Sequence, residues 1–338
     1  MKQQPLVSII SGYYNREDFV DDSIQSLIDQ TYQNTEIIIF DDCSTDKTYD
    51  KLVAIANTDS RIRLIRNLEN KGFVRSLIDA VESAKGEYIA IHGSGDFSYP
   101  TRIEKQVHVL NSQPNIGVVG TFVENINVSG ANESRSLMQV PINGNAISQL
   151  EKRNIFTHGE VMFRKGLHDM VGGYRSFFKF TQDYDLWSRL STVCDFHNVP
   201  EVLYKRYLRS DGATVDPEKR LYQALLAEVV CQNFKFIKLR KPDLVDQFGE
   251  NTFSNLGQLS EKGTNNLYSR ILNVFLENKK NSHLSKQAIM LFAKKSNKKV
   301  TSIILFGLFF LIPKPIGLRI MQLPKFRVLL DLTFSKLK

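Results

Sequence analysis

The chain has 338 residues, of which 42% are hydrophobic, and its formal net charge is +8. This length is sufficient for one large α/β domain with an additional segment. The three cysteines, Cys43, Cys194 and Cys231, lack the spacing of a metal site and predict free thiols, and no segment resembles a module that reads nucleic-acid bases. The first residues lack the apolar core of a signal peptide, so we expect a cytoplasmic protein.

Strand-like and helix-like segments alternate from residue 7 to about residue 123. Short apolar runs predict strands, and the amphipathic stretches between them predict helices. This alternation is typical of a mostly parallel sheet with helices on both faces. The predicted strands cover residues 7–11, 36–40, 62–65, 88–91 and 117–123, and the predicted helices cover 18–30, 46–57, 72–84 and 100–112. Residues 125–145 are polar and predict a loop or an irregular hairpin.

Chemically distinctive residues follow the first two predicted strands. Gly12 and Asn15 come after the first strand, and Asp41 and Asp42 come after the second. Open α/β sheets bind ligands at the carboxyl ends of their strands, so the paired carboxylates predict a ligand site. The alternative is a capping cluster at the start of the next helix, and both roles can hold together.

These two segments resemble the opening of family 2 glycosyltransferases. They read V-S-I-I-S-G-Y-Y-N and D-D-C-S-T-D-K-T, against roughly V-S-(I/V)-I-I-P-T-Y-N and D-D-(G/C)-S-x-D-x-T in the family. The resemblance implies that one of the two aspartates accepts a hydrogen bond from the base or ribose of a nucleotide. The nucleotide-binding residues that it implies are Gly12, Tyr13, Tyr14, Asn15, Asp41 and Asp42. Gly12 stands where the family usually has proline, and Tyr13 stands where it usually has threonine.

A third segment, residues 85–106, resembles the family stretch in which an acidic D-x-D cluster holds a divalent metal at the diphosphate of the donor. Gly93 and Gly95 occupy the two acidic positions, and Asp96 alone remains. The resemblance implies Mg²⁺ or Mn²⁺ bound by Asp96, with Ser94 and Gly95 beside the donor. One protein carboxylate is compatible with Mg²⁺, which commonly keeps waters and takes further ligands from phosphates.

The alternative is that residues 93–95 form only a tight turn and that Asp96 caps the next helix. If transfer needs no metal, cationic side chains would have to neutralise the diphosphate. Arg102 and Lys105, in the predicted helix that follows, are the candidates for that role.

A fourth segment, residues 181–190, resembles the family motif E-D-x-(D/E)-L-W-x-R-L. The resemblance implies that Asp183 is the general base that removes the proton of a sugar hydroxyl. Gln182 replaces the usual glutamate, Trp187 is expected in the core, and Arg189 is expected to form an ion pair. The residues implied on the acceptor side are His158, Gly172, Gly173, Tyr174 and Gln182.

The C-terminal third of the chain contains no specific motif. We expect a catalytic domain over residues 1–215, a helical region over 216–299 and an apolar, basic tail over 300–338. The apolar run 300–312 is shorter than the roughly 20 residues that span a bilayer, and lysines precede it. A helix at the membrane surface is expected, and a buried helix or a subunit interface is the alternative.

Together, these segments imply a GT-A fold, which is a Rossmann-like, mostly parallel sheet flanked by helices, with a helical C-terminal extension. The implied activity is inverting transfer of a sugar from a nucleotide-sugar to an acceptor hydroxyl. The expected acceptor is a glycan or a lipid-linked precursor of cell-surface polysaccharide, and the expected location is the cytoplasmic face of the membrane. A catalytically silent nucleotide-sugar-binding protein is the alternative. A Rossmann dehydrogenase is disfavoured because no Gly-x-Gly-x-x-Gly follows the first strand.

Overall fold

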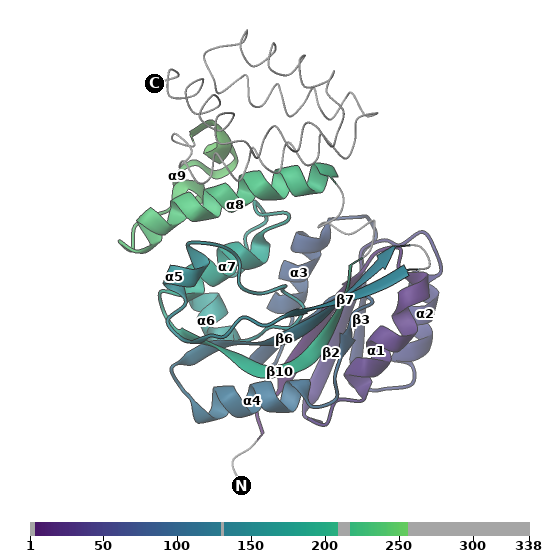
Figure 1. Cartoon of the computed structure of the whole chain (residues 1–338). Helices are drawn as coiled ribbons and strands as arrows, with labels where there is room; N and C mark the ends of the chain where they lie inside the picture. The colour runs from purple at the N-terminus through teal and green to yellow at the C-terminus, as the bar shows by residue number, and fades with distance from the viewer. Residues whose placement is uncertain (1–3, 130–131, 209–216, 256–338) are drawn as a thin grey trace. The chain divides into compact units, whose positions relative to one another are not determined.

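The computed structural model describes residues 4–129, 132–208 and 217–255, and they form a ten-stranded mixed sheet flanked by helices (Figure 1). The strand order is β3-β2-β1-β4-β9-β6-β10-β5, with β7 paired to β6 and β8 paired to β10. The strands are β1 (Val7–Tyr13), β2 (Thr35–Asp41), β3 (Ile62–Arg66), β4 (Tyr88–His92), β5 (Phe97–Ser98), β6 (Ile116–Ser129), β7 (Asn132–Met138), β8 (Asn143–Gly144), β9 (Met162–Arg164) and β10 (Asp195–Leu208).

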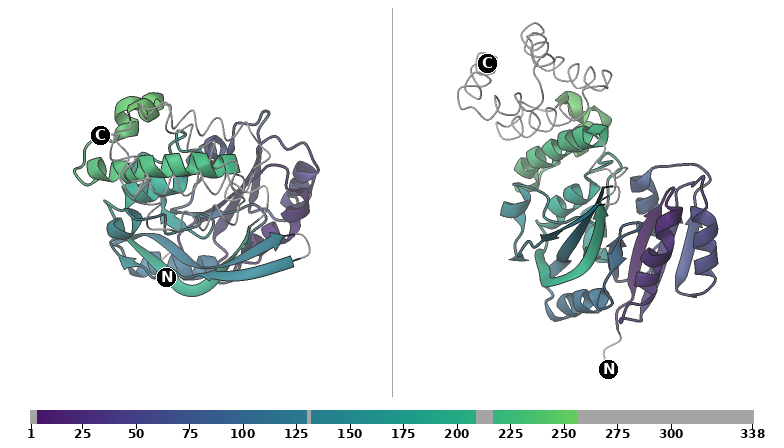
Figure 2. Two further views of the ribbon diagram at one scale, coloured as in Figure 1. Left: turned by 45° about the horizontal axis from the view of Figure 1, so that its top comes forward. Right: turned by 45° about the vertical axis from the view of Figure 1, so that its right-hand side comes forward.

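The first half of the sheet is parallel, as the alternating pattern predicts. Strand β1 pairs in parallel with both β2 and β4, and β2 pairs in parallel with β3. The helices that accompany this half of the sheet are η1 (Glu17–Phe19), α1 (Val20–Ile28), α2 (Thr48–Ala56), α3 (Phe73–Glu82) and α4 (Arg102–Ser112). Buried residues of α1, α2 and α4 share one core with β1 and β2, while α3 contacts the same two strands from the other side (Figure 2).

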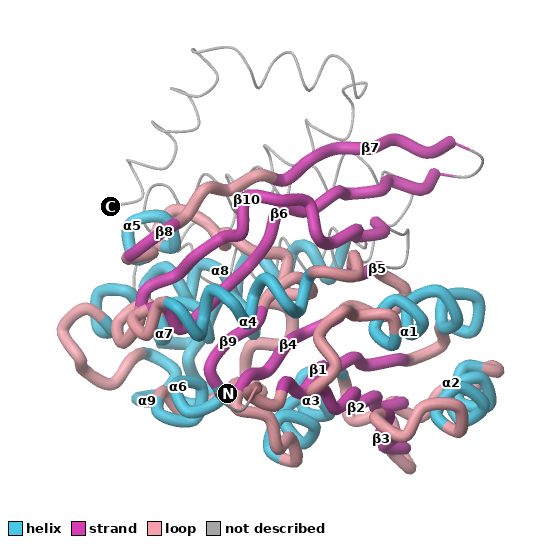
Figure 3. The backbone as a smooth tube through the Cα atoms, turned by 90° about the horizontal axis from the view of Figure 1, so that it is seen from below, coloured by secondary structure: helices cyan, strands magenta, loops and turns pink. Residues whose placement is uncertain are grey.

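The second half of the sheet is mixed. Strand β9 is antiparallel to both β4 and β6, so it separates the parallel first half from the parallel pair β6 and β10. Strands β6 and β7 form a long antiparallel hairpin beside β10 (Figure 3), so the polar segment after residue 125 is a hairpin. The predicted fold class is confirmed, although its parallel character is concentrated in the first half.

By their contacts, the described residues up to 208 and from 226 to 255 belong to one compact unit, which therefore continues beyond the sheet. The remaining helices are α5 (Ile147–Leu150), α6 (Lys165–Met170), α7 (Gln182–Leu190), α8 (Pro217–Ile237), α9 (Leu244–Phe248) and η2 (Gly249–Asn255). Within the described ranges, no helix is both long enough and apolar enough to cross a membrane. The expected membrane-surface tail, residues 300–338, lies outside those ranges.

Candidate functional site

The carboxyl ends of β1 and β2 lie side by side and bring the first two motif segments together. Tyr13 pairs with Asp41 in the register of the two strands. At residue 12, an ideal Cβ would come within 2.0 Å of Phe40 Cζ, so the ring of Phe40 occupies the space that a larger residue would need. Glycine at position 12, where the family usually has proline, is therefore matched to Phe40.

The residues at the end of β1 and just after it differ in how far their side chains are exposed. Tyr13 is buried and donates its hydroxyl to Ser23, so its side chain belongs to the core and only its backbone can line a ligand. Tyr14 is exposed. Asn15 adopts a φ of 51° and accepts a hydrogen bond from the Thr45 backbone, which fastens the loop after β1 to the loop after β2.

Asp42 accepts four hydrogen bonds from groups within the protein. Its carboxylate accepts hydrogen bonds from four donors: the Asn67 side chain at 2.8 Å, the Lys71 and Gly72 backbone N–H groups at 2.9 Å each, and the Ser76 hydroxyl at 3.1 Å. These contacts hold the loop that leads into α3. The expectation that Asp42 binds the nucleotide is therefore not supported by its geometry, because its side chain performs a structural task.

Asp41 has an unused oxygen. Its Oδ2 accepts a hydrogen bond from the Ser44 backbone at 3.1 Å, whereas its buried Oδ1 has no partner. A buried acceptor without a partner is rare in native proteins and calls for an explanation such as an absent ligand. Of the two aspartates, Asp41 is the one that remains a candidate for binding a base or a ribose.

The turn after β4 is held by the distant strand β10. Asp96 Oδ2 accepts a hydrogen bond from the Tyr204 hydroxyl at 2.7 Å, and Oδ1 accepts one from the Tyr207 backbone at 2.9 Å. The Gly93 N–H donates to the same Tyr204 oxygen at 2.9 Å. Gly95 adopts a φ of 77° and donates its N–H to Ser23, and Ser94 is partly exposed.

Buried polar groups lie behind this turn. His92 is hydrogen-bonded to Ser23 at 3.0 Å and to Ser98 at 3.1 Å. Burial, together with the charge of Arg102, lowers the pKa of His92 to about 3, so the ring is neutral. His92 is therefore a structural residue.

The two alternative cations in α4 are wrong candidates. Arg102 is completely buried and donates to the Ile91 carbonyl, the Ser98 hydroxyl and the Gln106 side chain. Lys105 forms an ion pair with Glu201. Neither side chain is available to neutralise a diphosphate.

The proposed base, Asp183, lies in the first turn of α7. Its carboxylate is 8% exposed and accepts a hydrogen bond from the Asn154 amide at 2.6 Å. Burial raises the pKa of Asp183, against the Asn154 hydrogen bond and the charge of Arg206, which both lower it. The preceding residue, Gln182, has a buried Oε1 without a hydrogen-bond partner.

The second acid of the motif has a different environment. Asp185 is completely buried between Arg175 and Arg189, and Arg175 also pairs with Asp243 at 2.7 Å. Burial opposes ionisation of Asp185, but the charges of Arg189 and Arg175 outweigh it and lower its pKa. The expected ion pair of Arg189 and the expected core position of Trp187 are both found. Asp185 anchors α7 through two arginines, whereas Asp183 is hydrogen-bonded to the neutral side chain of Asn154.

Of the expected acceptor-side residues, Tyr174 lies close enough to Asp183 for that carboxylate to contribute, after burial, to raising the pKa of Tyr174. His158 is buried with a φ of 84°, and its Nε2 is hydrogen-bonded to the Tyr174 hydroxyl at 2.9 Å. Burial lowers the pKa of His158 to about 3, so it is a neutral ring that orients Tyr174. Gly172 and Gly173 have φ values of 83° and 65°, which glycine adopts without strain.

An aromatic contact, not foreseen from the motifs, links the two halves of the site. The ring of Phe73 lies 5.8 Å from that of Phe40 and 6.1 Å from that of His158. Phe73 is the first residue of α3 and is 41% exposed. An exposed ring between the nucleotide side and the acceptor side offers an apolar surface to a bound ligand.

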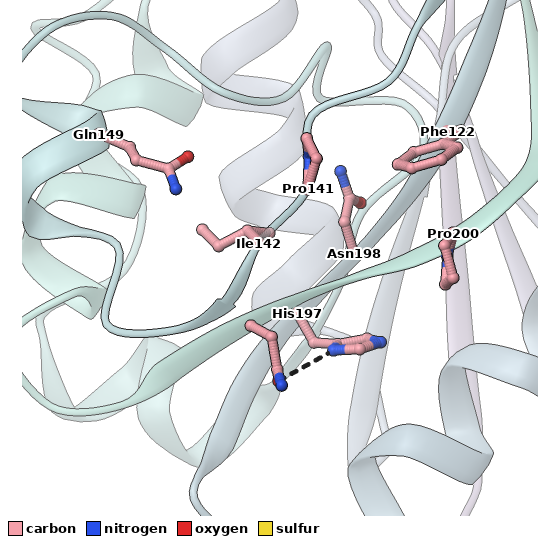
Figure 4. A pocket seen from close by; sticks show the side chains of 8 residues that line it. Phe122, Pro141, Ile142, Gln149, His197, Asn198 and Pro200 are labelled. Carbon is pink, nitrogen blue, oxygen red and sulfur yellow. Dashed lines mark hydrogen bonds between the residues drawn. The ribbon is translucent and has the colours of Figure 1, made fainter.

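A separate surface pocket lies elsewhere on the sheet. It has a volume of about 310 Å³ and is lined by Phe122, Pro141, Ile142, Asn143, Gln149, His197, Asn198 and Pro200 (Figure 4). None of the residues predicted for the site lines it. The candidate site is therefore identified by its chemistry and not by this pocket.

The residues at the turn after β4 do not form a ligand set for a divalent cation. Within residues 4–129, 132–208 and 217–255, no group of three or more His, Cys, Asp or Glu side chains could hold a metal ion. Both oxygens of Asp96 already accept hydrogen bonds from β10. The donor set that the resemblance implies is thus incomplete in this chain.

The motif comparison did not identify three residues that lie at or near the candidate site, namely Asn154, Phe73 and Arg206. Asn154 and Phe73 meet the site only through tertiary contacts. Arg206 belongs to β10, and the alternation of side chains along the strand could have placed it on the same face as Tyr204.

Comparison with known proteins agrees with this geometry. The family model for glycosyl transferase family 2 matches residues 8–183. EpsE of Bacillus subtilis, named as a glycosyltransferase, is 35% identical over 250 residues, covering 72% of this chain and 87% of EpsE. The Escherichia coli enzyme WfaP, a UDP-Glc:alpha-D-GlcNAc-diphosphoundecaprenol beta-1,3-glucosyltransferase, is 43% identical over 108 residues, covering 32% of this chain and 42% of WfaP.

Solved structures share the fold at low sequence identity. S. aureus TarS 1–349 in complex with UDP matches with a TM-score of 0.53 at 16% identity, covering 88% of each chain. The mannosyltransferase PcManGT from Pyrobaculum calidifontis, solved with GDP-Man and Mn²⁺, matches with a TM-score of 0.52 at 16% identity, covering 97% of this chain and 83% of PcManGT. The strand-end carboxylates, the GT-A fold and the family match together establish that this chain belongs to glycosyl transferase family 2 and is a glycosyltransferase.

Proposed function

We propose that the enzyme transfers a sugar from a nucleotide-sugar to an acceptor hydroxyl with inversion at the anomeric carbon, and that Asp183 is the general base. The observation that carries this proposal is the carboxylate of Asp183, which is nearly buried and held in place by Asn154. A raised pKa brings a carboxylate closer to the working pH and makes it a better proton acceptor than an exposed aspartate.

In this mechanism the acceptor oxygen attacks C1 from the face opposite the leaving group. The C1–O bond to the diphosphate breaks, and its electron pair remains on the diphosphate oxygen. The acceptor proton passes to Asp183. Gln182, with an unpartnered buried Oε1, is suited to accept a hydrogen bond from a second hydroxyl of the acceptor.

The nucleotide is proposed to bind at the ends of β1 and β2. Asp41 supports this placement, because its buried Oδ1 has no partner and can accept a hydrogen bond from a base N–H or a ribose hydroxyl. Asp42 contributes indirectly, since its four hydrogen bonds fix the neighbouring loop. TarS has been solved with UDP-GlcNAc and PcManGT with GDP-Man, so UDP-GlcNAc and GDP-Man are the first donors to test.

The proposed acceptor is a precursor of cell-surface polysaccharide. WfaP is named for a lipid diphosphate-linked acceptor, and TuaG of Bacillus subtilis, 38% identical over 107 residues and matching 42% of TuaG, is named for teichuronic acid biosynthesis. A lipid-linked acceptor fits attachment to the cytoplasmic face of the membrane. The basic and apolar residues 279–338 supply the composition for such attachment.

The metal expected at Asp96 has weaker support than the base. PcManGT was solved with Mn²⁺, but in the present chain Gly93 and Gly95 replace the acidic residues of the resemblance.

The activity is tested by nucleoside diphosphate release. Purified full-length protein is incubated with UDP-sugars or GDP-mannose and with an undecaprenyl-diphosphate-linked sugar, and Asp183→Asn serves as the inactive control. Acceptor-dependent release by the wild-type protein alone is the expected result. Equal release by both proteins would contradict the role of Asp183, and product analysis by NMR would check the inversion.

Membrane attachment is tested separately by vesicle flotation. The full-length protein should float with anionic vesicles, and a protein lacking residues 300–338 should not. If the full-length protein stays unbound at low salt, membrane attachment through the tail is wrong.

A further inference from the structure

The carboxylate of Asp96 and the hydroxyl of Tyr204 lie against Gly93, one of the two positions at which the family has an acidic residue. An ideal Cβ on residue 93 would come within 2.3 Å of Asp96 Oδ2 and 3.1 Å of the Tyr204 oxygen, and one on residue 159 would come within 2.2 Å of that same oxygen. Gly93 and Gly159 thus enclose the Tyr204 hydroxyl. A carboxylate at position 93 would displace Asp96 from its hydrogen bonds with β10.

Asp96 is therefore better described as a structural residue that joins the turn to β10 than as a metal ligand. Tyr204 is completely buried, and its hydroxyl bridges the Gly93 N–H and the Asp96 carboxylate. With the Tyr207 N–H on the other oxygen, both carboxylate oxygens hold the turn to β10. This arrangement ties the turn to the strand without a cation.

The leaving diphosphate nevertheless requires positive charge, because its negative charge increases as the sugar departs. Arg102 is completely buried, and Lys105 forms an ion pair with Glu201, so neither is a good candidate for binding the diphosphate. Arg206 is a better candidate. It lies two residues after Tyr204 on β10, so strand alternation places it on the same face as Tyr204.

The surroundings of Arg206 also favour a ligand. Its guanidinium makes no hydrogen bond or ion pair with any residue in the part of the chain that the structure describes, and it is only partly exposed. Its charge is close enough to lower the pKa of Asp183. On β6, its neighbour in the register is Asn125, whose buried Oδ1 has no partner.

The basic residue on the opposite face of β10, Lys205, contacts aromatic rings. Lys205 points away from the turn, with its Nζ over the rings of Phe97 at 5.5 Å and Tyr99 at 5.7 Å. Arg206 is thus the basic residue of this strand segment on the side of Asp96.

We propose that Arg206 binds the diphosphate of the donor and that transfer requires no divalent cation at the Gly93–Asp96 turn. The guanidinium takes two phosphate oxygens through paired N–H donors and stabilises the charge that the departing diphosphate acquires. No proton moves to or from Arg206, since its charge is permanent. This inference rests on the proposed function.

The test is calorimetric titration in excess EDTA with UDP, GDP, ADP and dTDP, and with the nucleoside of whichever diphosphate binds. The proteins are wild type, Arg206→Met and the matched control Lys205→Met. We expect wild type and Lys205→Met to bind the diphosphate alike, and Arg206→Met to bind it about 10- to 100-fold more weakly. Affinity for the nucleoside should be the same in all three proteins.

Turnover gives a second readout. Wild-type activity in EDTA should equal that with added Mg²⁺ or Mn²⁺, and Arg206→Lys should retain more activity than Arg206→Met. Thermal melting confirms that each variant is folded, and if Arg206→Met is not, Arg206→Gln replaces it.

The outcomes separate the two proposals. A wild-type protein that binds the diphosphate only with added metal, or an Arg206→Met variant with wild-type affinity, overturns the role of Arg206 and leaves the transferase proposal standing. A wild-type protein that binds none of the four diphosphates or their nucleosides, with or without metal, overturns the proposed nucleotide site, and this inference with it.

Discussion

The ring of Phe40 lies directly against the backbone of Gly12, with its Cζ only 2.0 Å from where a Cβ on residue 12 would stand. Gly12→Ala should therefore destabilise the protein by about 1–3 kcal/mol, because the added methyl group overpacks a buried site. Urea unfolding measures the change. In the double variant Gly12→Ala/Phe40→Leu, the smaller side chain makes room, so the two effects should be non-additive. Strict additivity would argue against the contact.

Asp183→Asn should reduce turnover about 10²- to 10⁴-fold, which is the usual contribution of a general base. Binding of the nucleoside diphosphate should change little, since the carboxylate acts on the acceptor. Steady-state kinetics and calorimetry on the same preparation separate the two quantities. Turnover above half of the wild-type value would eliminate Asp183 as the base.

Asn154→Ala should shift the acidic limb of the activity profile to higher pH. The hydrogen bond from Asn154 lowers the pKa of Asp183, so its loss raises that pKa, and the base ionises only at higher pH. The measurement is kcat/KM against pH. Asn143→Ala, which alters an exposed asparagine hydrogen-bonded to His197, should leave the profile unchanged.

The two adjacent aspartates should respond differently to the same change. Asp41→Asn should weaken nucleotide binding by about 1–3 kcal/mol while the fold persists. Asp42→Asn should instead lower the free energy of unfolding by about 1–3 kcal/mol, because its buried donors lose acceptors. Calorimetry and denaturant unfolding are run on both. The reverse pattern would show that the assignments are exchanged.

Asp185→Asn should be strongly destabilising, by about 3–5 kcal/mol, because it removes the carboxylate paired with Arg189 and one of those paired with Arg175. The pKa of Asp185 is lowered in the folded state, so the stability it contributes is present above its unfolded pKa and is lost as the pH falls through the folded value. Guanidinium unfolding at several pH values measures this. Asp79→Asn, which removes an exposed pair with Lys71, should have an effect near zero.

The sequence located the carboxyl ends of β1, β2 and β4 to within two residues, because strand, turn and helix signals are local in the chain. They could not distinguish Asp41 from Asp42, since that difference depends on donors from residues 67–76. They also could not foresee the Tyr204 hydroxyl on Asp96, a contact between residues 108 positions apart.

The place of strand β9 between β4 and β6 could not be predicted, for a different reason. Met162–Arg164 is only three residues long, too short to show a periodic pattern, yet it joins the two halves of the sheet. Arg102 and Lys105 were misjudged because a basic side chain in a sequence carries no sign of whether it is buried or paired. Burial is a property of the whole fold.

The Arg175 contact with Asp243 has a practical consequence for any shortened form of this enzyme. Asp243 lies well beyond residues 8–183, which the family model matches, yet it shares the Arg175 guanidinium with Asp185 of α7, the helix that carries the proposed base. A protein cut at residue 215 would retain every recognisable motif and lose Asp243, together with the Asn233 side chain that donates to it at 3.0 Å. Such a protein should be poorly soluble or inactive for reasons unrelated to its catalytic residues. The smallest working enzyme is therefore longer than its motifs.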